Sequence, residues 1–282
     1  AEKMLHRHQF HQLESCGERG VKIEIRSFIV KVKLWKGRCY MRVGVISDIH
    51  NNVVALNAVL EKLNAENCEQ IICCGDIIGI GPYPEETVQR IMQIPNIIAV
   101  RGNHERYLLE GMPTQVPNEE NMGYDEMDHH KWEHSLLSNE SIQFLKVLPY
   151  RKDFVLGGFH FSVMHYCMDS SSNRYINYTR NPKLDDCYRM FSDVDADIIL
   201  YGHDHKPSVN RDERRMFANF GSLGCPVKDG NVARAGILTI NNGKLDFESI
   251  KVFYEVDKVI ADINRLAYPA SEEIKRFFFN TK

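Results

Sequence analysis

The 282-residue sequence predicts an α/β fold in which two β-sheets pack as a sandwich flanked by helices. Two observations support this prediction. From residue 41, short apolar runs typical of buried strands alternate with segments whose apolar residues recur at helical spacing. After residue 150, several apolar runs follow one another, separated by turns. Alternation followed by consecutive strands is typical of two packed sheets with helices outside them.

The first 40 residues differ from the rest of the sequence. "AEKMLHRHQFHQLESCGERG" has no steady period, whereas "VKIEIRSFIVKVKLW" alternates polar and apolar residues as a half-exposed strand does. A clean buried strand, "MRVGVISDIH", begins only at Met41. We therefore expect residues 1–40 to be an N-terminal extension or leader outside the core, with an extra edge strand as the alternative.

The spacing of apolar residues and the helix-capping residues predict the strands and helices that follow Met41. "RVGVIS", "QIICC" and "NIIAV" are predicted to be buried strands. Between the first two, residues 52–66 form a predicted helix with Asn52 as a suitable N-cap. A second helix, "EETVQRIMQI", is opened by Pro84, and residues 125–147 are expected to form two helices that break near Ser138.

The second half of the chain contains mostly strands. "DFVLGG" and "FHFSVMH" form a predicted hairpin, and "ADIILYG", "RMFANFG", "ARAGILTI" and "KLDFESIKVFY" are predicted strands. The turn "NNG" separates the last two. The tail has the spacing of two helices separated at Pro269, so residues 255–282 are expected to be a helical extension packed on the domain.

Composition and charge narrow the class of protein. The net charge of −3 gives no electrostatic signal for nucleic-acid binding. No stretch approaches the roughly 18 apolar residues that span a bilayer, so we expect no membrane partner. The eight cysteines show no paired CxxC spacing, which predicts reduced thiols and a cytoplasmic location.

Five of the predicted strands end in residues that commonly bind metals. In chain order these residues are Asp48, His50, Asp76, Asn103, His165, His203 and His205. Ligands gather beyond the carboxyl ends of the strands in open α/β sheets. We therefore expect these side chains to converge, with Gly75, Gly102 and Gly202 allowing the backbone to turn sharply there.

The residue types indicate a metal centre. Two carboxylates, four imidazoles and one amide oxygen suit Mn²⁺, Fe, Zn²⁺ or Ni²⁺ better than Ca²⁺, which prefers oxygen ligands. Seven ligands are too many for one tetrahedral ion, but they suit two ions roughly 3.5–4 Å apart with one bridging carboxylate. We therefore predict two divalent metal ions, Mn²⁺ first, with Fe, Zn²⁺, Ni²⁺ or Mg²⁺ as alternatives.

The motifs D-x-H, G-D, G-N-H-E, a lone histidine and G-H-x-H occur in that order and resemble those of the calcineurin-like metallophosphoesterase superfamily. "GDIIGIGPYP", "RGNHE", "ILYGHDHKP" and "NFGSLGCP" resemble its small bacterial and archaeal phosphodiesterase branch. The resemblance covers about residues 42–240. It implies a four-layer α-β-β-α sandwich of the metallo-dependent phosphatase type, formed by residues 41–254.

The resemblance also implies a role for each candidate residue. One metal would be held by a carboxylate and two imidazoles, those of Asp48, His50 and His205. The other would be held by an amide and two imidazoles, those of Asn103, His165 and His203. Asp76 would bridge the two metals. His104 would be the catalytic general acid or phosphate-stabilising imidazole, and Glu105 either orients it or is a plain exposed carboxylate.

The predicted activity is metal-dependent hydrolysis of a phosphate ester by in-line attack of a hydroxide that bridges two metals, with a phosphodiester as the leading substrate. The substrate is expected to be a small phosphoester, with nucleotide-derived esters among the candidates, and the sequence does not indicate an oligomeric state. Phosphomonoesters, phosphoproteins and dinucleoside polyphosphates are alternative substrates, and a non-catalytic scaffold of the same fold is an alternative class. The segment "IIGIG" lacks the arginine that phosphoprotein phosphatases carry there, which weakens that alternative.

Substrate contacts are expected from residues after the metal-bearing strands. The candidates for binding a phosphate or stacking on a base are Arg101, Tyr166 and Arg174. In the predicted helix that starts near residue 125, the polar sequence suggests that three histidines are solvated: His129, His130 and His134.

Overall fold

The first sheet has the order β12-β11-β1-β2-β3 in the computed structural model, which describes residues 40–169, 174–176, 179–225 and 232–279. Its central strand β1 (Tyr40–Ile46) is parallel to β2 (Gln70–Cys73), which in turn is parallel to β3 (Ile98–Ala99). On the other side, β11 (Val232–Asn241) and β12 (Lys244–Phe253) are antiparallel. Of the expected N-terminal extension, residues 1–39 lie outside the described residues, and Tyr40 belongs to β1.

Helices cover the outer face of this sheet. They are α1 (Val53–Ala65), α2 (Pro84–Met92) and α5 (Asn139–Val147), and their apolar side chains share one core with the sheet. The start of α1 is fixed as the sequence predicts, because the Asn52 side chain accepts a hydrogen bond from the Ala55 N–H at 3.0 Å.

The second sheet has the order β4-β5-β8-β10-β9. Its strands are β4 (Arg151–Leu156), β5 (Phe159–Met164), β8 (Ile198–Leu200), β9 (Ser208–Arg211) and β10 (Met216–Asn219). The three central strands β5, β8 and β10 run parallel, so their carboxyl ends lie at the same edge.

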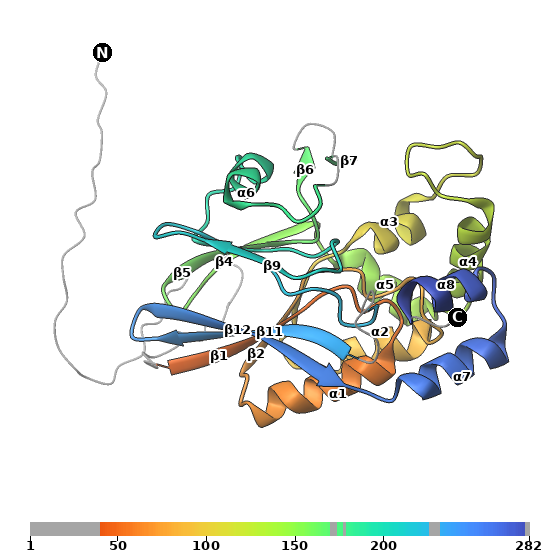
Figure 1. The fold of residues 1–282 in the computed structure, drawn as a ribbon, viewed down its shortest axis with the longest axis horizontal. Coiled ribbons are helices and arrows are strands. Elements are labelled where there is room, and N and C mark those ends of the chain that lie inside the picture. Colours follow the sequence, from red (N-terminus) through yellow and green to blue (C-terminus); the bar gives the residue numbers. More distant parts are fainter. Residues whose placement is uncertain (1–39, 170–173, 177–178, 226–231, 280–282) are drawn as a thin grey trace, which may run out of the picture. The chain divides into compact units, whose positions relative to one another are not determined.

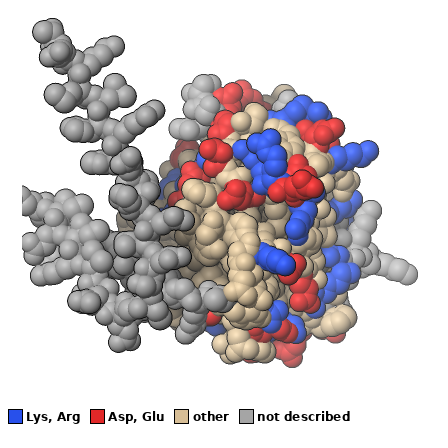
Figure 2. Space-filling model, turned by 90° about the vertical axis from the view of Figure 1, so that its left-hand side faces the viewer, with Lys and Arg blue, Asp and Glu red and all other residues tan. Residues whose placement is uncertain are grey.

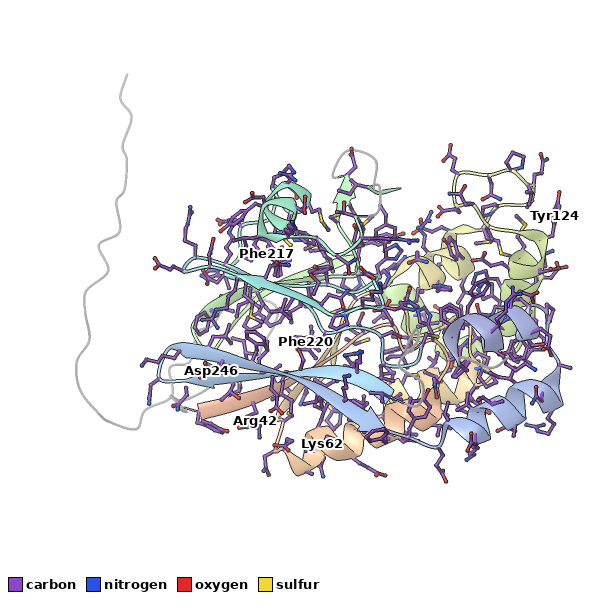
Figure 3. All side chains as sticks on the ribbon, in the orientation of Figure 1. Arg42, Lys62, Tyr124, Phe217, Phe220 and Asp246 are labelled. Carbon is purple, nitrogen blue, oxygen red and sulfur yellow. The ribbon has the colours of Figure 1, made fainter. Side chains whose placement is uncertain are left out.

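The two sheets face each other, with α1 below the first and α6 (Leu184–Met190) above the second (Figure 1). Alternation along β10 shows the layers: Phe217 packs towards α6, whereas Phe220, just after the strand, lies in the core between the sheets (Figure 3). The predicted four-layer α-β-β-α sandwich is confirmed. A small ribbon of β6 (Met168–Asp169) and β7 (Arg174–Tyr175) was not predicted.

Four further helices lie on the side where the parallel strands end (Figure 1). They are α3 (Asn103–Glu110), α4 (Tyr124–Ser135), α7 (Val256–Leu266) and α8 (Ser271–Phe278). As Pro269 predicts, the tail forms two helices, and their apolar faces share a core with Ile80 and Cys225 from the loops around the strand ends. The tail therefore packs directly beside the loops that carry the predicted ligands.

The surface view gives little sign of a single-charge patch. On the face in Figure 2, Lys and Arg side chains are interspersed with Asp and Glu. None of the helices in the described ranges is long and apolar enough to cross a membrane.

Candidate metal centre

The seven predicted ligands come together where the loops after β1, β2, β3, β5 and β8 meet. In two groups the carboxylate and imidazole ligand atoms lie within 4.8 Å of one another: Asp48 with His50 and His205, and Asp76 with His165 and His203. The Asn103 Oδ1 atom lies beside the two imidazoles of the second group. The backbone carboxyl ends of parallel strands place these loops side by side, as the sequence analysis assumed.

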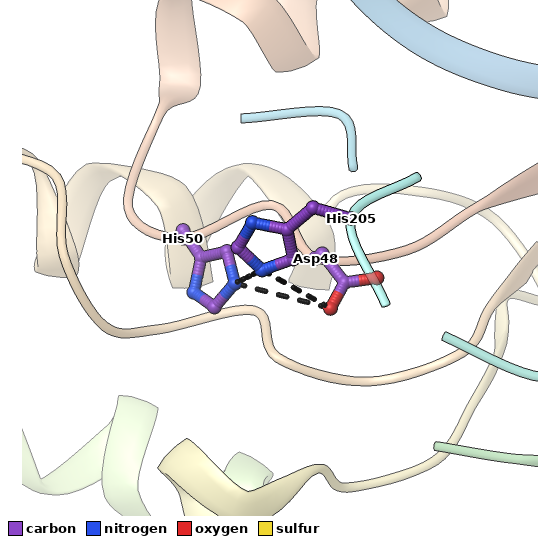
Figure 4. A group of neighbouring side chains, drawn as sticks. All are labelled: Asp48, His50 and His205. Atoms are coloured by element: carbon purple, nitrogen blue, oxygen red, sulfur yellow. Dashed lines mark hydrogen bonds and ion pairs between the residues drawn. The ribbon is translucent and has the colours of Figure 1, made fainter. Parts of the chain in front are cut away.

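The first group consists of Asp48, His50 and His205, whose side chains point towards one another (Figure 4). The His50 Nε2 and His205 Nε2 atoms are 3.0 Å apart. The Asp48 Oδ1 atom lies 3.7 Å from His205 Nε2 and 3.9 Å from His50 Nε2. Three donor atoms from strand ends far apart in sequence thus surround one point.

The second group surrounds Asn103. Its Oδ1 atom lies 3.1 Å from His165 Nε2 and 3.0 Å from His203 Nδ1. Asp76 lies between the groups, because its Oδ2 atom is 3.0 Å from His165 Nε2 and 3.9 Å from His50 Nε2. His104 Nε2 is also 3.9 Å from this oxygen.

The hydrogen bonds of the ligating imidazoles fit a metal. His50 Nδ1 donates to the Ile78 carbonyl at 3.2 Å, and His165 Nδ1 donates to the Cys74 carbonyl at 2.8 Å. In the neutral rings, these bonds leave the Nε2 lone pairs directed into the site, the arrangement that metal-binding histidines need. Asp48 Oδ2 is buried without a hydrogen-bond partner. The lone pairs and carboxylate oxygens that meet there suit cations.

The pKa values follow from burial and from the charges inside the site. Burial lowers the pKa of His203 to about 4 and, with the neighbouring imidazoles, holds the pKa of His50 well below its usual value. Burial would also lower the pKa of His165, but the carboxylates, chiefly Asp76, outweigh it and raise the pKa to about 9. A positive charge is therefore favoured between Asp76 and His165.

Several ligands occupy left-handed backbone conformations that non-glycine residues seldom adopt. The φ angles are 52° at Asp48, 48° at His50, 51° at Asp76 and 70° at His203. Such conformations cluster at functional sites because the surrounding structure enforces them. Gly102 is also required, since a Cβ atom there would lie 2.1 Å from Asp76 Oδ1.

Residues 41–243 match the sequence model of the calcineurin-like phosphoesterase superfamily domain. The chain belongs to the calcineurin-like phosphoesterase superfamily. This assignment confirms the family predicted from the motifs and identifies the protein at the level of a phosphoric ester hydrolase.

Individual relatives of this phosphoesterase are distant. The chain is 28% identical over 249 residues to the uncharacterized protein MJ0912 of Methanocaldococcus jannaschii, covering 79% of this chain and 93% of the relative. It is 27% identical over 164 residues to phosphodiesterase MJ0936 of the same organism, covering 57% of this chain and 81% of the relative. A metallophosphoesterase structure from Sphaerobacter thermophilus shares the fold, with a TM-score of 0.63, 24% identity and coverage of 84% and 98%.

Glu105 has a different role from either one expected in the sequence analysis. Its side chain is fully buried, and its two carboxylate oxygens accept four backbone N–H groups between 2.6 and 3.0 Å: those of Asp76, Ile77, Ile78 and Gly102. The carboxylate therefore holds the loop that carries Asp76 and is neither exposed nor bonded to His104.

The prediction that the histidines of α4 are solvated is wrong for two of them. His129 and His130 are buried, and His134 is partly buried. They surround the buried Glu133, which accepts from Gly79 N at 2.8 Å and pairs with His130 Nδ1 at 2.6 Å. The polar face of α4 is thus packed against the loop after Asp76, an arrangement that periodicity alone does not reveal.

Two of the three predicted substrate contacts, Arg101 and Tyr166, make hydrogen bonds within the protein. Arg101 points away from the metal ligands, because its guanidinium donates to the carbonyls of Leu148 and Lys146 at the end of α5. Tyr166 is buried, accepts a hydrogen bond from Thr179 N, and packs behind His203 with ring centroids 4.9 Å apart. In this arrangement the guanidinium of Arg101 and the hydroxyl of Tyr166 are both engaged by other parts of the protein, and the side chain of Arg174 lies outside the described part of the chain.

Two polar residues that the sequence analysis missed hold the ligand loops. Asn219 Nδ2 donates to the Gly202 and Asp204 carbonyls on either side of His203. Ser222 Oγ donates to the Asp48 carbonyl at 2.8 Å. Both lie in "NFGSLG", a segment recognised for its resemblance but not for these contacts.

Proposed function

We propose that this protein is a dinuclear metallophosphoesterase that hydrolyses phosphodiesters. The observation that carries the proposal is the position of Asp76, whose carboxylate lies between two three-residue groups of donor atoms. A carboxylate between two such groups is the arrangement expected for a pair of bridged ions. The name of the phosphodiesterase relative supports a diester as the substrate.

In this proposal, each group would hold one cation and Asp76 would bridge them. The first group is Asp48, His50 and His205, and the second is Asn103, His165 and His203. Two divalent ions, with Mn²⁺ as the leading candidate, would supply Lewis acidity that activates water and neutralises phosphate oxygens. The carbonyls that accept from the Nδ1 atoms of His50 and His165 orient these rings so that each Nε2 atom faces the site.

His104 is proposed as the group that protonates the leaving alcohol. Its backbone N–H donates to Asp76 Oδ1 at 3.1 Å, which fixes the start of α3 beside the bridging carboxylate. Its ring is buried at the site and lines the adjoining cavity, where a substrate could reach it. Burial lowers the pKa of His104 to about 3. A phosphate anion bound beside the ring would favour the protonated, proton-donating form.

The test is hydrolysis of bis(4-nitrophenyl) phosphate and 4-nitrophenyl phosphate with Mn²⁺ and after EDTA treatment. Asp76→Ala should lose both metal binding and activity. His104→Ala should keep its metal content and lose rate by about a hundredfold or more, as expected for a lost general acid. The absence of turnover with every divalent metal would refute the proposal, and equal loss of metal in both variants would refute the separate roles.

A further inference from the structure

A cavity of about 480 Å³ extends from the candidate metal centre towards the C-terminal helices. At one end it is lined by residues of the site, including Asp76, Asn103 and His104. At the other end it is lined by α8, which the sequence analysis expected only to pack on the domain. A substrate whose phosphate lies at the metals would therefore extend one of its ester groups along α8.

The α8 wall is apolar and partly aromatic. Ile274, Phe277 and Phe278 line the cavity. The Phe278 ring lies 5.7 Å from the ring of the candidate ligand His205, measured between centroids. Phe277 is 60% exposed, although a large aromatic side chain on a helix usually packs inwards. The wall thus begins beside the metal ligands and offers an open aromatic surface.

The polar part of the rim is acidic. Asp125 and Glu126 come from the first turn of α4, and Glu273 comes from α8. Among the described residues that line the cavity there is no lysine or arginine. The two basic residues of α8, Lys275 and Arg276, are not part of the lining, and the Arg276 guanidinium lies over the Phe277 ring at 4.9 Å from its centroid.

These features distinguish between kinds of ester group. Apolar surface stabilises an apolar group in proportion to the area that leaves water. The rim carboxylates repel a further phosphate in the same cavity, and water weakens this repulsion without removing it because all three residues are exposed. A polyphosphate chain would need basic residues, which this wall does not supply.

We propose that this cavity binds one ester group of the substrate, and that this group is apolar and carries no negative charge. The inference rests on the proposed phosphodiesterase function, because the metals fix where the phosphate lies. It names the substrate class as phosphodiesters with an uncharged aromatic or aliphatic arm, and it excludes dinucleoside polyphosphates as preferred substrates. Phe277 and Glu273 are the residues expected to set this preference.

The proposed apolar contact with the ester group is tested with Phe277→Ala, and Phe253→Ala is the matched control. Phe253 is 79% exposed at the end of β12 and does not line the cavity. Phe277→Ala should raise the KM for bis(4-nitrophenyl) phosphate about threefold to tenfold, as expected for lost apolar contact, with kcat little changed. The control should leave KM unchanged. Equal KM values for the two variants would overturn the proposal.

The charged part is tested with Glu273→Lys, and Glu61→Lys makes the same change in net charge on the exposed surface of α1. Glu273→Lys should lower the KM for diadenosine tetraphosphate, whereas Glu61→Lys should not. Identical effects of the two lysine variants would show that the net charge of the protein, and not the rim of the cavity, governs the preference for an uncharged ester group. That result would overturn the role proposed for Glu273.

Binding measured without turnover separates this inference from the proposed function. Phenol, which is uncharged at neutral pH, is added to metal-free wild-type protein and to the Phe277→Ala variant, and contact is followed by saturation-transfer NMR. Phenol binding that is lost in the Phe277→Ala variant would support the cavity assignment. If no phosphoester is hydrolysed as well, only the proposed function is refuted. Normal metal-dependent hydrolysis with phenol binding equal in both proteins would refute only the cavity assignment.

Discussion

Replacing Glu105 by glutamine tests how the loop that carries Asp76 is held. The change keeps the size of the side chain but removes its charge and turns one oxygen into an N–H₂ donor. In the structure, Glu105 Oε1 accepts from Ile77 N and Ile78 N, and Oε2 accepts from Asp76 N and Gly102 N. Either orientation of the glutamine therefore leaves two buried backbone N–H groups facing a donor.

The expected loss of stability follows from these two unpaired N–H groups. A buried donor without an acceptor costs about 1–3 kcal/mol, so two of them cost about 2–6 kcal/mol. The free energy of unfolding of a typical domain is only about 5–15 kcal/mol. Glu105→Gln should therefore lose a large part of the stability. It should also weaken metal binding, because each orientation releases backbone N–H groups at or next to Asp76: those of Asp76 and Gly102, or those of Ile77 and Ile78.

The free energy of unfolding is measured by urea denaturation of the metal-free protein, and metal affinity by titration calorimetry of the folded protein. Glu61→Gln, an exposed residue on α1, makes the same chemical change without burial and should match the wild type. If Glu105→Gln unfolds at the same urea concentration as Glu61→Gln, the four hydrogen bonds do not hold the loop and the argument is refuted.

Three further outcomes are expected. Arg101→Ala should lower stability by about 1–2 kcal/mol through the lost carbonyl contacts, with the KM for bis(4-nitrophenyl) phosphate unchanged, so a large rise in KM would restore its predicted substrate role. The pKa of His165 is raised to about 9 by Asp76 against the effect of burial, so its stabilising contribution is complete below about pH 6.5 and is lost towards pH 9. Thermal unfolding of the EDTA-treated protein should show a loss of about 3 kcal/mol at most across that range, and a flat profile would contradict it. Glu133→Gln should lower the free energy of unfolding by about 2–4 kcal/mol in urea, because it removes the buried carboxylate that pairs with His130 Nδ1 and accepts from Gly79 N and Asn51 Nδ2; a variant as stable as wild type would contradict this.

The sequence alone allowed the layered fold and the seven candidate ligands to be predicted. Both predictions depend on local pattern: apolar runs form strands, and the residue that follows a strand lies at the edge of the sheet whatever the rest of the chain does. The helix start at Asn52 and the break at Pro269 were predictable for the same reason, since a cap or a proline acts on its own neighbours.

Only the tertiary structure decided the surroundings of the site. Glu105 and Glu133 are polar residues on short helices and suggest solvated side chains, yet both are buried by loops distant in sequence and bond to backbone N–H groups. Arg101 follows a metal-bearing strand but turns to the end of α5, and Phe277 reaches the cavity from the far end of the chain. Sequence pattern records what a residue prefers locally, whereas these roles depend on which groups the folded chain brings next to it and on the cost of leaving buried polar groups unpaired.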